Sequence, residues 1–420
     1  RQYHILLFSL FFTFNVCLPD KYLGTGGPSS LILYHCFRRV IIVFILLFTL
    51  IYSYYNSSQY IVNTTIEKII TSMQFKDTPY WSTLQPIIAN GAMKAAIDGN
   101  YQYPHRINLY PGTSCMFSCH FCNRNYDHVV RDSDNVFSQV IEQDDGSDKH
   151  RFGVTGGLEP LTSPYIGKIC KDLHDGGYVS RMVTNGFLLN DKMLRTNPYI
   201  NSLDSIRVSL YGMDHKETLS TTKHAKGYEV VKQNLTNYNK RKDRTLLYLN
   251  YVLLPENISK LETILEYMMD IGGADSISLR EDHSFRYNVN DRNKLQDALL
   301  KFDERVKKYY RITIDYGYGL QNAMKGLDTP LIQVTHKELN YTQAPQVKVC
   351  LDPHGDIFSY MDAGFVGRHG VKRYCLGNVT NSSLEKQLKK MKRIKPQKQD
   401  PAYLDAYNHL IQRYIYEQTK

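Results

Sequence analysis

From residue 107 onward, short β-rich runs alternate with helix-like segments, and this alternation limits the possible folds more than any other feature. Three of the runs end in glycine-containing turns. The six runs are Ile107–Tyr110, Phe152–Thr155, Ser180–Thr184, Ser205–Leu210, Leu246–Leu254 and Ser276–Leu279. A repeated order of strand and helix predicts a parallel sheet that curves toward a barrel.

Helix-like segments separate these runs. The clearest are Pro164–His174, Tyr228–Arg241 and Lys260–Ile271. In the last of them, apolar residues recur at three- and four-residue spacing, as on the buried face of an amphipathic helix. The predicted fold class is therefore α/β, a partial (β/α)6 TIM-like barrel with a small C-terminal cap. Ligand-binding residues in such a fold lie at the carboxyl ends of the strands.

The composition is that of a globular chain. Of the 420 residues, 42% are hydrophobic and 22% are charged, which excludes collagen-like, coiled-coil and wholly disordered classes. The 51 lysines and arginines against 41 aspartates and glutamates give a net charge of +10. This excess suggests an anionic ligand or a basic tail before it suggests a nucleic-acid binder.

The domain organisation that we expect has four parts. An apolar segment covers residues 1–72, a helical lead-in 73–104, the core barrel 105–320, and a C-terminal cap with a basic helical tail 321–420. The first segment contains no methionine before Met73, and we interpret it as upstream read-through, a membrane anchor or a targeting segment. Membrane association is expected only if this segment belongs to the mature protein.

Three of the eight cysteines, Cys115, Cys119 and Cys122, fall within eight residues. Three thiolates on one loop can hold three irons of a four-iron cluster and leave the fourth iron open for a ligand. A zinc site normally takes pairs of cysteines at Cys-x-x-Cys spacing plus two further ligands, and the nearby His120 is poorly placed between two of the thiols. The pattern favours an iron–sulfur site in a reducing, cytoplasmic compartment.

The loop resembles the C-x-x-x-C-x-aromatic-C signature of the radical S-adenosylmethionine (SAM) superfamily, with Phe121 as the aromatic residue. The resemblance extends over residues 106–280. It implies a 4Fe-4S cluster whose open iron binds S-adenosylmethionine, and a flavodoxin- or ferredoxin-like electron donor. It further implies reductive cleavage to a 5′-deoxyadenosyl radical that abstracts a hydrogen atom from the substrate.

A glycine-rich segment after the second run resembles the Gly-Gly-Glu-Pro motif of this family. Gly156, Gly157 and Glu159 supply the motif residues, and Leu158 is inserted between the second glycine and the glutamate. Glycines let a backbone approach a ligand closely. The resemblance implies that this segment binds the amino group of S-adenosylmethionine; a plain strand–turn–helix connection is the alternative.

Three further residues at strand ends are predicted to contact the cofactor. Asn185 follows the third run, Ser209 ends the fourth, and Arg280 follows the sixth. A turn, a capping role and a salt bridge with Glu281 or Asp282 are their respective alternatives.

The C-terminal region resembles the SPASM or twitch extensions that carry auxiliary clusters, but in degenerate form. Cys350 and Cys375 are its two cysteines, and Tyr360 stands where another cysteine is expected. Three interpretations remain open: a cluster-free cap, a hydrogen-atom donor role for Cys350 or Cys375, and a true auxiliary cluster. Cys170 lies in a helix-like segment and is expected to be a small buried residue.

The substrate is not readable from the sequence. We expect epimerisation, dehydration or dehydrogenation of a sugar or peptide. Peptide or protein maturation, and a non-catalytic iron–sulfur or zinc-binding protein, are the alternatives. The basic stretch Lys386–Lys398 is interpreted as a solvated helix face, and no nucleic-acid partner is expected.

Overall fold

The computed structural model divides the chain into two units, Arg1–Asp77 and Thr78–Lys420. It describes residues 81–122, 130, 135–281, 289–327, 341, 343–359, 364–365, 372–391, 393–395 and 406–419, all within the second unit. The interpretations of residues 1–72 lie outside these ranges. Across the described residues, no helix is both long and apolar enough to span a membrane.

One mixed sheet forms the centre of the second unit. Its strand order is β10-β9-β8-β1-β2-β3-β4-β5-β6-β7, so that β10 and β7 are its two edges and the described sheet does not close. Strands β1 to β7 are parallel, β8 is parallel to β1, and β9 and β10 are antiparallel to their neighbours. The strands are β1 (Arg106–Leu109), β2 (Phe152–Val154), β3 (Arg181–Thr184), β4 (Ser205–Leu210), β5 (Leu246–Leu253), β6 (Ser276–Glu281), β7 (Thr313–Tyr316), β8 (Lys348–Leu351), β9 (Asp356–Phe358) and β10 (Cys375–Asn378).

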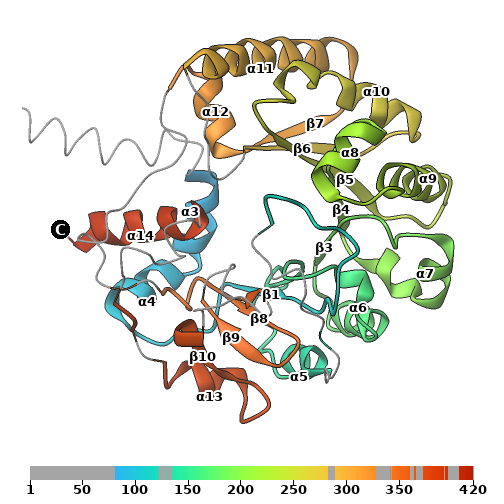
Figure 1. Ribbon diagram of the computed structural model, residues 1–420. Helices are drawn as coiled ribbons and strands as arrows, with labels where there is room; N and C mark the ends of the chain where they lie inside the picture. The colour runs from blue at the N-terminus through green and yellow to red at the C-terminus, as the bar shows by residue number, and fades with distance from the viewer. Residues whose placement is uncertain are drawn as a thin grey trace, which may run out of the picture. The chain divides into compact units, whose positions relative to one another are not determined.

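The helices of the barrel part cover the outer face of the parallel strands (Figure 1). The α-helices are α3 (Trp81–Ala89), α4 (Ala92–Asp98), α5 (Val136–Glu142), α6 (Ile166–Asp175), α7 (Asp191–Thr196), α8 (His215–Thr222), α9 (Gly227–Asn239), α10 (Thr263–Asp270), α11 (Val289–Tyr309), α12 (Tyr318–Met324), α13 (Leu384–Leu388) and α14 (Ala406–Thr419). Short 3-10 turns follow β2, α7 and β5 and precede β10: Pro160–Thr162, Pro198–Ser202, Ile258–Lys260 and Lys372–Tyr374.

The predicted α/β class and partial barrel are confirmed. The six expected runs coincide with β1 to β6, and the three clearest predicted helices are α6, α9 and α10, shifted by one to three residues at their ends. Strand β7 extends the parallel sheet beyond the six predicted strands, and β8 extends it on the far side of β1. The four parts proposed from the sequence, and the boundaries between them, stay predictions.

Side chains of the central strands alternate between two environments. Along β5, Leu247, Leu249, Tyr251 and Leu253 are buried, while the residues between them are only partly buried. The buried set belongs to the same hydrophobic core as Ile264 and Leu265 of α10. Successive strand residues point to opposite faces, so the partly buried set lines the inner face, away from the helices.

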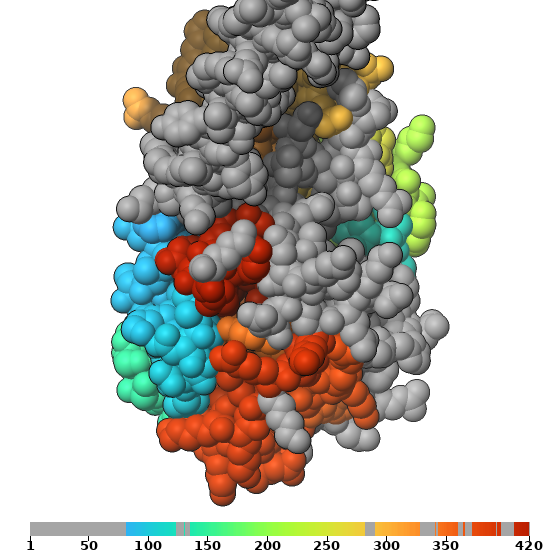
Figure 2. Space-filling model, turned by 90° about the vertical axis from the view of Figure 1, so that its left-hand side faces the viewer, coloured from blue at the N-terminus to red at the C-terminus, as the bar shows by residue number. Residues whose placement is uncertain are grey.

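The C-terminal elements pack beside the first helices and the first strand of this unit. Helix α14 contacts α4, and Figure 2 shows its red surface directly against the blue surface of α3 and α4. The hydroxyl of Tyr341 donates to the carbonyl of Ala96 at 2.5 Å. Strand β8 then pairs with β1 along its length. The N-terminal and C-terminal parts of this unit are therefore joined twice, by the contact of α14 with α4 and by the pairing of β8 with β1.

A buried arginine connects the segments that enter β1 and β2. The Arg151 guanidinium donates from Nε to the carbonyl of Pro104 at 2.9 Å and contacts the carboxylates of Asp144 and Asp145. The side chains of Arg151 and Asp144 are 2% and 0% exposed. Removing one partner of a buried ion pair leaves an uncompensated charge, which is strongly destabilising.

We therefore expect Arg151→Met to lower the free energy of unfolding by about 3–5 kcal/mol. Urea denaturation followed by circular dichroism measures the change. Lys389→Gln is the matched control, because it removes an ion pair with Glu385 whose side chains are 54% and 52% exposed. Such surface pairs contribute little, so its midpoint should not move. Equal midpoints for the two variants would contradict the structural role assigned to Arg151.

Candidate functional site

The cysteine loop follows β1 at the carboxyl edge of the sheet and is fixed by backbone hydrogen bonds. The amide of Ser118 donates to the carbonyl of Thr222 at 2.8 Å, and that of His120 to the carbonyl of Thr221 at 3.3 Å. The amide of Cys122 donates to the carbonyl of Cys119 at 3.0 Å. The end of α8 therefore holds the middle of the loop.

Aromatic packing orients the loop around the end of β4. The Phe117 ring lies 5.5 Å from that of Tyr211, edge to face, and the Phe121 ring lies 6.1 Å from it in a stacked arrangement. A Cβ at Gly227 would lie 3.4 Å from Cε1 of Phe117, so this glycine leaves room for the buried phenyl ring. Phe117 and Phe121 thus pack on either side of one tyrosine.

The three cysteines of the loop form no disulfide with one another or with any other described cysteine, and all three lie near Tyr211. Burial raises the pKa of Tyr211 well above its usual value, and the charges of Cys119, Cys115 and Cys122 add to this effect. In the described part of the chain, no three His, Cys, Asp or Glu side chains are already close enough to share a single metal ion. Three thiols on one short loop are nonetheless the donor set that an iron–sulfur cluster requires.

The glycine turn after β2 has the left-handed backbone that glycine adopts without strain. Gly156 and Gly157 have φ angles of 57° and 71°. A Cβ at Gly156 would lie 2.4 Å from Cε1 of Tyr110, and one at Gly157 would lie 3.3 Å from Cδ2 of the same ring. One side of the turn is therefore closed by Tyr110. The inserted Leu158 is buried with Val130 and packs against Cys115.

Glu159 is a fully buried carboxylate that joins three segments of the site. Its Oε1 accepts from the amide of Leu161 at 3.1 Å and from the hydroxyl of Thr184 at 2.5 Å. Its Oε2 accepts from the amide of Asn185 at 2.8 Å. Its own amide donates to the carbonyl of Ser114, next to Cys115, at 2.9 Å. Burial raises the pKa of Glu159, and these hydrogen bonds oppose the rise.

Asn185 connects the end of β3 to the cysteine loop. Its Nδ2 lies 3.0 Å from Sδ of Met116 and 3.6 Å from Sγ of Cys115. Its Oδ1 accepts from the amide of Phe187 at 2.9 Å, which fixes the direction of the side-chain amide. The predicted cofactor residue therefore lies beside the first predicted cluster ligand.

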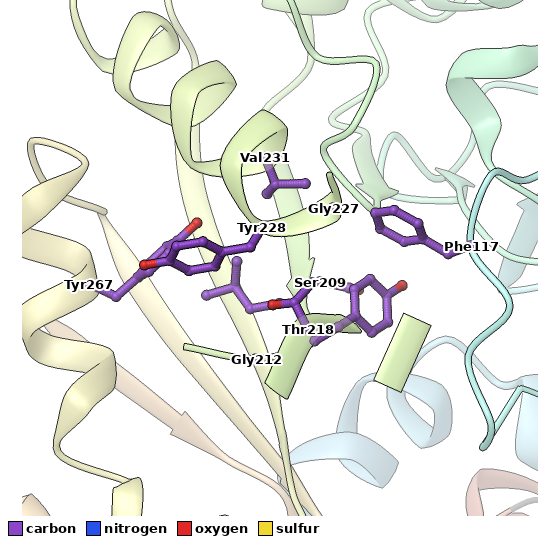
Figure 3. Close-up of a pocket in the computed structure, with 10 residues that line it drawn as sticks. Phe117, Ser209, Gly212, Thr218, Gly227, Tyr228, Val231 and Tyr267 are labelled. Carbon is purple, nitrogen blue, oxygen red and sulfur yellow. The ribbon is translucent and has the colours of Figure 1, made fainter. Parts of the chain in front are cut away.

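Ser209 ends β4 and borders a small cavity between this strand and α8 and α9. The cavity has room for about one water molecule, too little for a cofactor. Figure 3 shows Ser209 between Phe117 on one side and Tyr228 and Tyr267 on the other. In the sheet, Ser209 lies beside Asn250 of β5. Ser209 is thus a polar residue of the inner face, two residues before Tyr211 in the chain.

Arg280 pairs with a residue of the next strand. Its Nη2 bonds to Oδ2 of Asp315 in β7, and its Nη1 donates to the carbonyl of Asp315 at 2.9 Å. The sequence offered Glu281 as its local partner, but Glu281 accepts instead from the amide of Gly319 at 2.9 Å. Asp282, the other local candidate, lies outside the described residues.

Cys350 and Cys375 lie on β8 and β10, on either side of Phe358 in β9. Each is in register with Phe358, so two strand spacings, about 9–10 Å, separate them. Cys350 is 1% exposed and shares a small core cluster with Tyr110. Burial raises the pKa of the Cys375 thiol. Cys170 is buried as expected, and burial raises the pKa of its thiol to about 12.

Two residues of this site were missed from the sequence. Tyr211 directly follows β4, and its place at a strand end was the available signal. Arg207 lies within the fourth run but was not predicted as a site residue. Its position two residues before Ser209 places it on the same face of the strand, and this was the available signal.

Comparison with known proteins gives a consistent result. The family model described as the Radical SAM superfamily matches residues 109–268. A dTDP-4-amino-4,6-dideoxy-D-glucose ammonia-lyase from Streptomyces venezuelae is 34% identical over 322 residues, which cover 72% of this chain and 66% of that enzyme. A probable GTP 3′,8-cyclase from Sulfurisphaera tokodaii is 25% identical over 60% of this chain and 83% of its own length.

A solved structure shares the fold. The crystal structure of SuiB from Streptococcus suis superimposes with a TM-score of 0.52 at 15% identity, over 78% of this chain and 77% of SuiB. Its structure bound to S-adenosylmethionine gives 0.50 with the same coverage. The family implies S-adenosylmethionine and an iron–sulfur cluster, and the three cysteine side chains of the loop fit that requirement. The match to the family model and the 34% identity to a curated relative show that this chain is an enzyme of the radical SAM superfamily.

Proposed function

We propose that Cys115, Cys119 and Cys122 ligate a 4Fe-4S cluster, and that the enzyme removes ammonia from a nucleotide-linked amino sugar. The first part rests on three cysteines within one short loop after β1, inside the region that matches the Radical SAM family model. The 34% identity to a sugar ammonia-lyase supports the second. The matched region spans 66% of that relative, so the reaction of the whole enzyme is part of the proposal.

When bound, the cluster and S-adenosylmethionine supply a 5′-deoxyadenosyl radical that abstracts a hydrogen atom from the substrate. The chain's own residues position these groups. Gly156 and Gly157 present backbone amides near the loop, and Asn185 holds the Cys115 end of it. Phe121 orients the loop through its stacking on Tyr211. Ser209 and Arg280 are polar groups of the inner face available to the cofactor.

The proposed reaction is loss of ammonia from a carbon next to a carbinol carbon. Removal of the carbinol hydrogen atom would leave a carbon radical that loses the neighbouring amino group as ammonia. The resulting carbonyl-stabilised radical becomes the ketone when one hydrogen atom returns to it from 5′-deoxyadenosine, or one electron from the ferredoxin- or flavodoxin-like donor together with one proton. The net conversion of an amino alcohol to a ketone and ammonia is redox neutral. A flavodoxin or ferredoxin in a reducing, cytoplasmic compartment would supply the electron that starts the reaction.

For Cys350 and Cys375, both earlier roles stay proposals. A hydrogen-atom donor needs only one thiol near the substrate, whereas an auxiliary cluster needs ligands besides these two. Iron counting after anaerobic reconstitution separates the two cases: about four irons per chain exclude an auxiliary cluster, and about eight require one.

The cluster assignment predicts that Cys115→Ala, Cys119→Ala and Cys122→Ala each lose most bound iron and all formation of 5′-deoxyadenosine. Each variant removes one of three ligands. The readouts are iron content and chromatography after reaction with dithionite and S-adenosylmethionine. Cys170→Ala is the control, since this thiol is buried in α6 and should leave the iron content unchanged. Full iron loading in a loop variant would contradict the assignment.

The substrate assignment predicts ammonia release from a dTDP-linked 4-amino-4,6-dideoxyhexose. With the reconstituted enzyme, ammonia should depend on S-adenosylmethionine and reductant. The measurements are coupled detection of ammonia and mass spectrometry of the sugar product. The same nucleotide sugar with a hydroxyl in place of the amino group is the control. Formation of 5′-deoxyadenosine without ammonia would reject the lyase reaction and keep the family chemistry.

The glycine turn predicts a specific effect of Gly156→Ala. The new methyl group would meet the Tyr110 ring at 2.4 Å, and the displaced turn should bind S-adenosylmethionine more weakly. Gly177→Ala is a matched control, because Gly177 also has a positive φ, 67°, but nothing lies within 4 Å of its Cβ position. We expect Gly156→Ala to be less stable than the control by about 1–3 kcal/mol. Calorimetry gives the affinity for S-adenosylmethionine, and equal affinities in the two variants would argue against a cofactor role for the turn.

A further inference from the structure

The inner face of β4 to β7 carries polar rows, of which the proposed cofactor site uses only Ser209, while Arg280 is available to the cofactor or to the substrate. In the upper row, Ser209, Asn250, Ser278 and Asp315 lie side by side on successive strands. Arg207 lies one row deeper. Its strand neighbours Ile206 and Val208 are fully buried on the opposite face, against the helices. Arg207 therefore points into the barrel interior.

Two arginines converge there on a single carboxylate. Nη2 of Arg207 lies 3.7 Å from Oδ2 of Asp315, and Arg280 bonds to the same oxygen. Arg207 comes from β4 and Asp315 from β7, so the guanidinium crosses the interior to reach it. The Asp315 side chain is 46% exposed, so solvent reaches this group.

The interior has more positive than negative charge. Arg181, an exposed residue at the start of β3, is close enough for its charge to act on Arg207. Burial, together with the positive charges of Arg181 and Arg280, lowers the pKa of Arg207 to about 10. Among the described residues, Nε of Arg207 is buried without a hydrogen-bond partner. Three arginines with one partly exposed aspartate carry a formal charge of +2.

This arrangement is poor as a purely structural ion pair. Burying a guanidinium beside two others costs free energy that one carboxylate does not offset. A bound anion would relieve the repulsion and supply acceptors for the unused donors. Guanidinium groups match the oxygens of phosphoryl groups, with two parallel hydrogen bonds to each.

We propose that Arg181, Arg207 and Arg280 form an anion-binding subsite in the barrel interior that takes a phosphoryl group of the substrate. Asp315 holds two of the arginines in the empty enzyme and competes with the ligand for them. This inference rests on the proposed function, because it assigns the subsite to the diphosphate of a nucleotide-linked sugar. The sugar would then extend from the subsite toward the cysteine loop at the strand ends.

The test is calorimetric titration of the reconstituted full chain with thymidine diphosphate and with inorganic pyrophosphate. Arg207→Gln should weaken binding of both at least tenfold, and Arg207→Lys should restore part of it. Asp315→Asn should tighten binding, because it removes the competing carboxylate. Arg244→Gln is the control: it breaks an arginine–aspartate pair of similar exposure, with Asp275, that does not belong to this cluster, and affinity should not change.

The outcomes separate this inference from the proposed reaction. If Arg207→Gln weakens S-adenosylmethionine binding and leaves both phosphate probes unchanged, the arginines bind the cofactor carboxylate and the subsite is rejected. Ammonia release without measurable probe binding also rejects the subsite while the lyase reaction stands. Probe binding that depends on Arg207, without ammonia release, keeps the subsite and rejects the reaction. If Arg207→Gln does not fold, Asp315→Asn provides the test. The inference is overturned if this variant binds the phosphate probes more weakly than the unmodified enzyme does.

Discussion

The buried carboxylate of Glu159 is the interaction on which the site depends. A charge in a low-dielectric interior is stable only when hydrogen-bond donors surround it, and Glu159 has three. Two of these donors belong to the end of β3, and the Glu159 amide itself binds the segment just before Cys115. Three loops that leave different strands are thereby held in one arrangement. If this carboxylate moved, Asn185 and the first thiol of the loop would move with it.

Much of the fold followed from the sequence because its signals are local. Strands β1 to β6 are short runs rich in β-forming residues, and their alternation with helix-like segments identified them as strands. Strand β7 was not predicted, because Thr313–Tyr316 is partly polar and directly follows a long charged helix. Strand β8 is fully buried, but its partner β1 lies about 240 residues earlier in the chain. Pairing at that separation leaves no local signal.

Site residues could be predicted from the sequence where the residue type itself indicates the role. Contacts between segments that are distant in the chain could not be predicted. Three cysteines at that spacing predict cluster ligands from residue type alone, and in the structure their charges act on one tyrosine. The assignment of Glu159 to the cofactor stays a prediction, but the hydrogen bonds from Thr184 and Asn185 to its oxygens could not be read from the sequence. The inserted Leu158 departs from the Gly-Gly-Glu-Pro motif. In the structure its side chain packs against Cys115 and so contributes to the position of the loop. Contacts of this kind arise only when distant segments meet.

The excess of positive charge could likewise be counted from the sequence, whereas its location in the fold could not be. A net charge of +10 allowed either an anionic ligand or a basic tail. In the tail, Lys389 pairs with Glu385 and lies over the ring of Tyr101, so local partners on the surface satisfy it. Solvent and salt screen such groups. The side chain of Arg207 is only 16% exposed and lies within range of the charges of Arg181 and Arg280, so solvent screens it less than the lysines of the tail. The part of the excess that matters for recognition therefore lies inside the barrel.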